Sequence, residues 1–127
     1  MSHLERCVLI VDDEFLIAEG LRMQVEDMDL PVCAVAGTAD EAIAEARLHR
    51  PMIVLMDVRL KGEKDGVDAA LAIHRILGSK IIFITGSSDP ATMERISTDH
   101  PLAILRKPVA ERQLKAAIDI ALGQAMA

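Results

Sequence analysis

Apolar and polar positions divide this chain into two kinds of segment that alternate from one end to the other. One apolar run, 52–56, is followed directly by Asp57. Five successive apolar residues are typical of a strand buried on both faces of a sheet, because a half-exposed strand alternates apolar and polar positions. Comparable apolar runs predict four more strands, at 7–11, 32–36, 80–84 and 103–105.

Apolar residues that recur every three or four positions predict the helices. The first helix is expected to begin at 12–14, and the last to span about 110–122. Their apolar faces comprise Ile17, Leu21, Val25 and Met28 in the first helix, and Leu114, Ala117, Ile118, Ala121 and Leu122 in the last. The core should also contain the methionines at 23, 28, 52, 56 and 93.

Three further helices are predicted from the residues that would begin them. Thr38, Asp65 and Asp89 are suitable N-caps, and Glu41 stands three residues after Thr38 as in a capping box. The predicted helices end near 49, 77 and 98. Five strand–helix units in succession predict a doubly wound α/β fold, a five-stranded parallel sheet covered by five helices. With 127 residues and no low-complexity segment, one domain over 1–127 is expected.

Composition narrows the class of function. The net charge is −6, and the chain has two Phe and no Trp or Tyr. Direct nucleic-acid binding is therefore disfavoured, because basic faces and aromatic stacking platforms are lacking. Cys7 and Cys33 lack zinc-site spacing and are expected to be buried thiols of a reducing compartment. The apolar run 7–11 is too short for a signal peptide or a membrane span, so a soluble cytoplasmic protein is expected.

Charged and polar residues stand where the predicted strands end. Asp12 and Asp13 follow the first strand, Asp57 the third, Thr85 the fourth and Lys107 the fifth. Parallel strands bring these positions to one edge of the sheet, where ligands bind in open α/β folds. Each pair of carboxylates about 5 Å apart would cost roughly 3 kcal/mol at an effective dielectric near 20. A cation would relieve that repulsion, and oxygen ligands favour Mg²⁺ or Ca²⁺ over zinc. The lysine and the hydroxyl would suit a phosphoryl group.

Over about 4–122 the chain resembles the receiver domain of two-component response regulators (CheY-like). The resemblance is carried by Asp12-Asp13, Asp57, Thr85 and Lys107-Pro108. The resemblance implies a flavodoxin-like fold with strand order 2-1-3-4-5, the order that seats the first and third strands side by side. It also implies a phosphoacceptor signalling domain that catalyses only its own phosphotransfer and autodephosphorylation, and is otherwise not an enzyme.

The resemblance further implies a role for each site residue. Asp57 would take a phosphoryl group from a phosphohistidine, and Mg²⁺ would be bound by Asp13 and Asp57 directly and by Asp12 mostly through water. The backbone carbonyl of Arg59 would supply another metal ligand. Lys107 would pair with a phosphoryl oxygen and precede a cis bond to Pro108.

The remaining implied roles concern the loops around the phosphoryl group. Thr85 would hydrogen-bond a phosphoryl oxygen as the loop after the fourth strand closes, and Gly86 would leave room for the group. Arg59 and Ser87 would tune the phosphoryl lifetime. The family usually has Tyr or Phe where this chain has Ile104, so an inward swing of an aromatic ring cannot be its switch.

The implied partners are a sensor histidine kinase or histidine phosphotransfer protein and a downstream effector reached by binding, with neither nucleic acid nor membrane insertion. A weak dimer through the fourth helix, fifth strand and fifth helix is left open. No effector domain is expected after the last helix, which fits a single-domain regulator or a receiver cut from a longer chain. A non-phosphorylated interaction module is the main alternative. An aspartate-nucleophile phosphatase is disfavoured because Arg59 stands where it needs a second Asp, and a flavin protein because ring-binding loops are missing.

Overall fold

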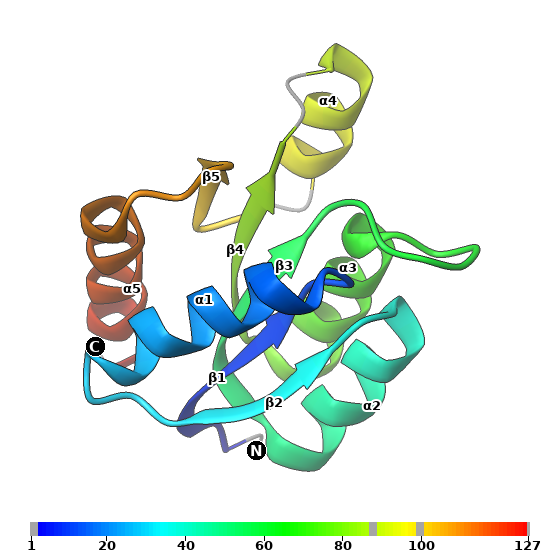
Figure 1. Cartoon of the computed structure of the whole chain (residues 1–127). Helices are drawn as coiled ribbons and strands as arrows, with labels where there is room; N and C mark the ends of the chain where they lie inside the picture. Colours follow the sequence, from blue (N-terminus) through cyan, green and yellow to red (C-terminus); the bar gives the residue numbers. More distant parts are fainter. Residues whose placement is uncertain (1–2, 87–88, 99–100, 127) are drawn as a thin grey trace.

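The computed structural model describes residues 3–86, 89–98 and 101–126. Five parallel strands form one sheet in the order β2-β1-β3-β4-β5, which confirms the expected order (Figure 1). The strands are β1 (Glu5–Val11), β2 (Val32–Ala36), β3 (Pro51–Asp57), β4 (Lys80–Thr85) and β5 (Ala103–Arg106). All five predicted strands are present, and each is extended by at most two residues except β2, which matches its prediction.

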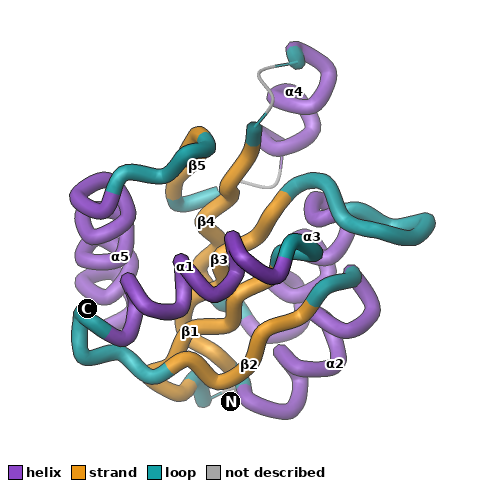
Figure 2. Tube along the Cα trace, viewed as in Figure 1, coloured by secondary structure: helices purple, strands orange, loops and turns teal. Residues whose placement is uncertain are grey.

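Helices cover both faces of this sheet (Figure 2). They are α1 (Phe15–Glu26), α2 (Ala39–His49), α3 (Gly66–Leu77), α4 (Pro90–Thr98) and α5 (Glu111–Met126). Buried side chains of α1 and α5 form one core cluster, and those of α2, α3 and α4 form the other. The doubly wound α/β fold is therefore confirmed.

β3 lies in the middle of the sheet and explains the uninterrupted apolar run. Ile53 and Leu55 face the cluster under α1 and α5, whereas Val54 and Met56 face the cluster under α2 and α3. All four side chains are at most 1% exposed. Burying each such side chain contributes about 1.5–3 kcal/mol, so the strand that carries Asp57 is held firmly in the core.

The helix termini follow the predicted capping residues with one correction. The Thr38 side chain accepts a hydrogen bond from the Glu41 amide at 3.1 Å, as an N-cap does. The Glu41 carboxylate, however, accepts from the Gly37 amide at 3.2 Å and not from that of Thr38, so the predicted capping box is wrong in its second half. A complete capping box instead joins Asp65 and Asp68 at the start of α3.

Two expectations for α1 are also wrong. The helix ends at Glu26, so Met28 lies in the following turn, although it still packs against the core. Met23, expected in the core, is 65% exposed. Helical spacing alone does not fix how far a helix is rotated about its axis, and here Leu21 and Val25 take the buried face. Within the part of the chain that the structure describes, no helix is both long and apolar enough to cross a membrane.

Candidate functional site

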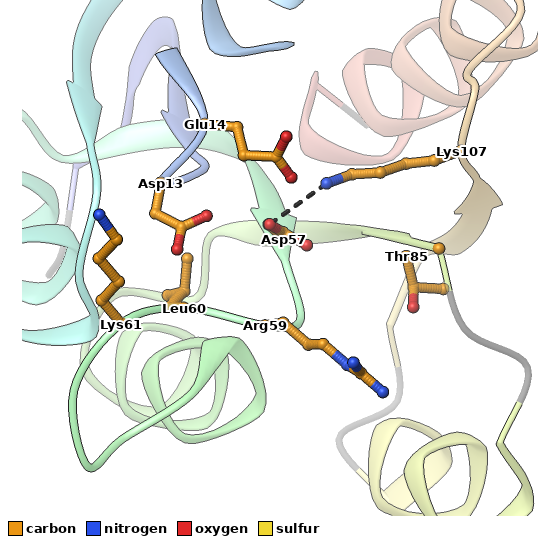
Figure 3. A pocket seen from close by; sticks show the side chains of 9 residues that line it. Asp13, Glu14, Asp57, Arg59, Leu60, Lys61, Thr85 and Lys107 are labelled. Atoms are coloured by element: carbon orange, nitrogen blue, oxygen red, sulfur yellow. Dashed lines mark ion pairs between the residues drawn. The ribbon is translucent and has the colours of Figure 1, made fainter. Parts of the chain in front are cut away.

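The carboxyl edge of the sheet holds a cavity of about 600 Å³ between the ends of the central strands and the loops that follow them (Figure 3). Its walls comprise Asp13, Glu14, Asp57, Arg59, Leu60, Lys61, Thr85, Gly86 and Lys107. Four of the strand-end residues predicted from the sequence are therefore in its lining. The fifth, Asp12, is buried and contacts Lys107. Sequence reasoning did not single out Glu14 and Leu60 as members of the site.

Lys107 joins two of the carboxylates. Its Nζ lies 3.2 Å from Asp12 Oδ2 and 3.3 Å from Asp57 Oδ2. The Lys107 amide donates to the Thr85 carbonyl at 2.9 Å, which holds the backbone of this lysine beside the end of β4. The bond between Lys107 and Pro108 is cis. Burial alone would lower the pKa of Lys107, but the charges of Asp57 and Asp12 outweigh burial and raise it.

Three acids form a compact oxygen cluster. Asp12, Asp13 and Asp57 each offer a carboxylate oxygen, and these oxygens lie within 4.8 Å of one another. Asp12 Oδ1 accepts from the Glu14 amide at 2.9 Å, whereas its buried Oδ2 accepts no hydrogen bond of good geometry from any residue that the structure describes. Its partner there is the Lys107 ammonium at 3.2 Å. Three carboxylate oxygens so close together, with one positive side chain between them, fit a hard divalent cation such as Mg²⁺.

The ionisation of Asp57 reflects this crowding. Burial and then the charge of Asp12 raise the pKa of Asp57 to about 6, although Lys107 and a hydrogen bond from the Arg59 backbone act to lower it. The carboxylate is therefore ionised at neutral pH but at a free-energy cost. Any cation held by the three acids would reduce that cost.

The loop after β3 packs tightly against the same strand end. The Gly66 amide donates to the Val58 carbonyl at 2.8 Å. A Cβ added to Gly66 would lie 1.8 Å from the Asp57 carbonyl oxygen, so only glycine fits here. Sequence reasoning did not single out Gly66, because no local pattern indicates that its backbone approaches Asp57.

The other predicted residues are placed as follows. Thr85 is buried at the end of β4, and Figure 3 shows Arg59 extending along the same side of the cavity. Gly86 lines the cavity and would accommodate a Cβ without a contact, so its role of leaving room for a ligand stays a prediction. Ile104 is 37% exposed on β5. Ser87 lies outside the described residues.

Comparisons with known proteins agree with this geometry. The family model of the response regulator receiver domain matches residues 8–119. The transcriptional regulatory protein PdtaR of Mycobacterium tuberculosis is 34% identical over 97% of this chain, and the phyllosphere-induced regulator PhyR of Methylorubrum extorquens is 34% identical over 91%. The match covers 60% of PdtaR and 43% of PhyR, so the chain spans about half the length of these relatives.

Solved structures show the same likeness. The signal receiver domain of a modulated diguanylate cyclase from Desulfovibrio desulfuricans has a TM-score of 0.89 and 38% identity, with 94% of each chain covered. A CheY-like receiver domain protein from Methanospirillum hungatei has a TM-score of 0.87 and 26% identity, with 98% of each chain covered. The family match, the sheet order and the strand-end residues lead to one conclusion: this chain belongs to the response regulator receiver domains of two-component signalling.

Proposed function

We propose that Asp57 accepts a phosphoryl group from a phosphohistidine on a partner protein. The observation that carries this proposal is Lys107, whose ammonium lies 3.2 Å from Asp12 and 3.3 Å from Asp57 at the rim of one cavity. In the transfer, a carboxylate oxygen of Asp57 bonds to phosphorus while the phosphorus–nitrogen bond breaks, and the electron pair stays on the imidazole. The ionised form of Asp57 is the nucleophile.

The surrounding residues would balance the negative charge of the phosphoryl oxygens during the transfer. Mg²⁺ would be held by Asp12, Asp13 and Asp57, with the Arg59 carbonyl as a further ligand, and would neutralise phosphoryl oxygens. Lys107 would move from its two carboxylates to a phosphoryl oxygen as the group arrives. Lysine serves this role as a compact charge on a flexible stem.

The response to phosphorylation would start at Thr85. Its hydroxyl would donate to another phosphoryl oxygen, which pulls the segment after β4 toward the site and moves α4. Ile104 lies beside Phe83 in the β4–β5 register and has no ring to swing inward. The output would therefore pass through α4 itself, with Gly86, Arg59 and Ser87 setting how long the phosphoryl group lasts.

The partners follow from the chemistry and from the surface beside the site. A sensor histidine kinase or histidine phosphotransfer protein would donate the group, and a downstream effector would be controlled by binding. Phe15 and Leu16 begin α1 directly after Glu14 and are 73% and 82% exposed, a patch suited to a donor protein that must reach Asp57. A weak dimer would use α4, β5 and α5. We propose a single receiver domain over 1–127 that acts in the cytoplasm, where thiols such as Cys7 and Cys33 stay reduced.

The test is a small phosphodonor with Mg²⁺ followed by intact-mass measurement. Wild-type protein should gain one phosphoryl group, and Asp57→Asn should gain none. Asp119→Asn is the matched control, because Asp119 is an exposed acid paired with Lys115 on α5, and it should be labelled like wild type. Equal labelling of the Asp57→Asn variant and the wild type would refute the assignment of the phosphoacceptor.

One observation supports a second candidate, an interaction module that is not phosphorylated. Ile104 replaces the usual switch aromatic, so the structural response could be lost even where the site remains. NMR of the amides near Thr85 and in α4 separates the two candidates. Shifts of amide signals beyond the cavity on addition of beryllofluoride and Mg²⁺ support the phosphorylated switch. Their absence supports the interaction module that is not phosphorylated.

A further inference from the structure

Helix α4 is held to the rest of the domain by few buried side chains. Among its described residues, only Ile96 is fully buried, and Met93 is partly buried against the same core cluster. By contrast, α3 buries six residues. An element with so little apolar burial opens at low free-energy cost, so its polar contacts weigh more in deciding where it lies.

Among the described residues of α4, one arginine makes a two-pronged attachment to another helix. Arg95 donates two hydrogen bonds to the carboxylate of Asp65, from Nη1 to Oδ2 at 2.7 Å and from Nη2 to Oδ1 at 3.2 Å. Its Nη2 also lies 3.5 Å from Asp68 Oδ1. We call this arrangement the Arg95 clasp. The Arg95 side chain is 49% exposed. Exposed ion pairs usually contribute little to stability, but bidentate arginine–carboxylate pairs are stronger than most.

The other end of the clasp is fixed to the phosphoacceptor strand. Asp65 Oδ1 accepts hydrogen bonds from the amides of Val67 at 3.0 Å and Asp68 at 3.1 Å and so caps α3. The next residue, Gly66, packs directly on the backbone of Asp57. Burial alone would raise the pKa of Asp65, but the hydrogen bonds and charge of Arg95 and the hydrogen bonds from Asp68 together lower it. Asp65 is therefore a rigid, charged anchor.

We propose that the Arg95 clasp holds α4 in its resting position and sets how readily α4 moves when the site is occupied. This inference rests on the proposed function, in which Thr85 engages the phosphoryl group and α4 moves in response. Movement of α4 relative to the start of α3 must lengthen or break the clasp. In a chain where Ile104 cannot act as a ring switch, the clasp supplies the resistance that separates resting and activated states.

The test compares wild type with Arg95→Gln, Arg95→Lys and Asp65→Asn, and with the double variant of Arg95→Gln and Asp65→Asn. Asparagine is as good an N-cap as aspartate, so Asp65→Asn removes the charge and keeps the start of α3. The control is Arg22→Gln, which removes a similarly exposed arginine (44% against 49% for Arg95) that pairs with Glu19 and Glu26 within α1. Two readouts are needed: amide hydrogen exchange of α4 without ligand, and the affinity for beryllofluoride with Mg²⁺.

Losing the clasp should speed exchange across α4 and tighten beryllofluoride binding, each by about three- to tenfold for Arg95→Gln. The exchange rate and the beryllofluoride affinity of Arg95→Lys should lie between those of Arg95→Gln and wild type, since lysine keeps the positive charge but cannot bind a carboxylate through two nitrogens. In the double variant, exchange and affinity should change no more than in Arg95→Gln alone. Both quantities should be the same in Arg22→Gln as in wild type.

Unchanged exchange and affinity in Arg95→Gln would overturn the inference, as would weaker beryllofluoride binding, which would mean that the clasp belongs to the activated state. Failure of the wild type to bind beryllofluoride would refute the proposed function instead. The exchange comparison needs no ligand, so it would still decide whether Arg95 holds α4.

Discussion

Gly66 lies against Asp57 so closely that a Cβ on Gly66 would be 1.8 Å from the Asp57 carbonyl oxygen. The obstacle is backbone in a central strand, which cannot rotate away as a side chain could. The start of α3 is thereby fixed relative to the proposed phosphoacceptor, and the loop between them has little freedom to absorb a larger residue.

Gly66→Ala should consequently destabilise the domain. We expect a loss of about 2–4 kcal/mol in the free energy of unfolding, since the loop or the strand must shift. Chemical denaturation measures it. Gly20→Ala is the matched control: a Cβ at Gly20 in the middle of α1 would meet nothing within 4 Å, so alanine should add about 0.5–1 kcal/mol of stability. Equal effects of the two substitutions would show that the close approach is relieved at no cost.

The ionisation of Asp57 predicts a pH-dependent stability in metal-free buffer. Its folded-state pKa of about 6 lies above the ordinary value of 3.8. The ionised carboxylate is therefore disfavoured in the folded protein, and stability present below the ordinary pKa is lost as the pH rises through the folded-state pKa.

Asp57→Asn should remove this penalty. The variant should be more stable than wild type by about 2 kcal/mol at pH 7.5, with the difference shrinking as the pH falls from about 6 to about 4. Thermal unfolding in the presence of a chelator, at several pH values, measures the difference. A gain that is constant over that range would show that ionisation of Asp57 is not its source.

Adding Mg²⁺ should reverse much of the penalty in the wild-type protein. Free Mg²⁺ at a hundred times its dissociation constant should add about 2.7 kcal/mol of stability. Asp13→Asn should greatly reduce this gain, because one of the three clustered carboxylates is lost, whereas Asp119→Asn should retain it. Isothermal calorimetry and unfolding with and without Mg²⁺ give the two measurements. A full Mg²⁺ effect in Asp13→Asn would remove Asp13 from the metal site.

The thiols of the first two strands should be unreactive in the folded state. Burial, followed by a hydrogen bond with Cys7, raises the pKa of Cys33 to about 12, and burial also raises the pKa of Cys7. Since the thiolate is the reactive form, alkylation of Cys33 at pH 8 should be at least about a hundredfold slower than that of a free cysteine. Mass spectrometry after timed alkylation tests this, and denatured protein, in which both thiols should react at the ordinary rate, is the control.

The fold class and most of the charged residues of the site could be predicted from the sequence. Apolar runs and helical periods are local patterns, so β3 and its neighbours were found from a few residues each. Because parallel strands all end at one edge, the order of elements also predicted that Asp12, Asp57 and Lys107 would meet. Capping residues such as Asp65 act on adjacent amides, which is why α3 begins where it was expected to begin.

Relationships between elements that are distant in sequence were visible only in the folded structure. The rotation of α1 exposes Met23, and helical spacing alone does not settle that rotation. Three contacts depend on how precisely distant elements are packed against one another. They are the ion pair of Lys107 with Asp12, the contact of Gly66 with Asp57 and the pairing of Arg95 with Asp65. Such placement follows from how the whole core interdigitates, a property of many side chains together that no short segment of sequence encodes.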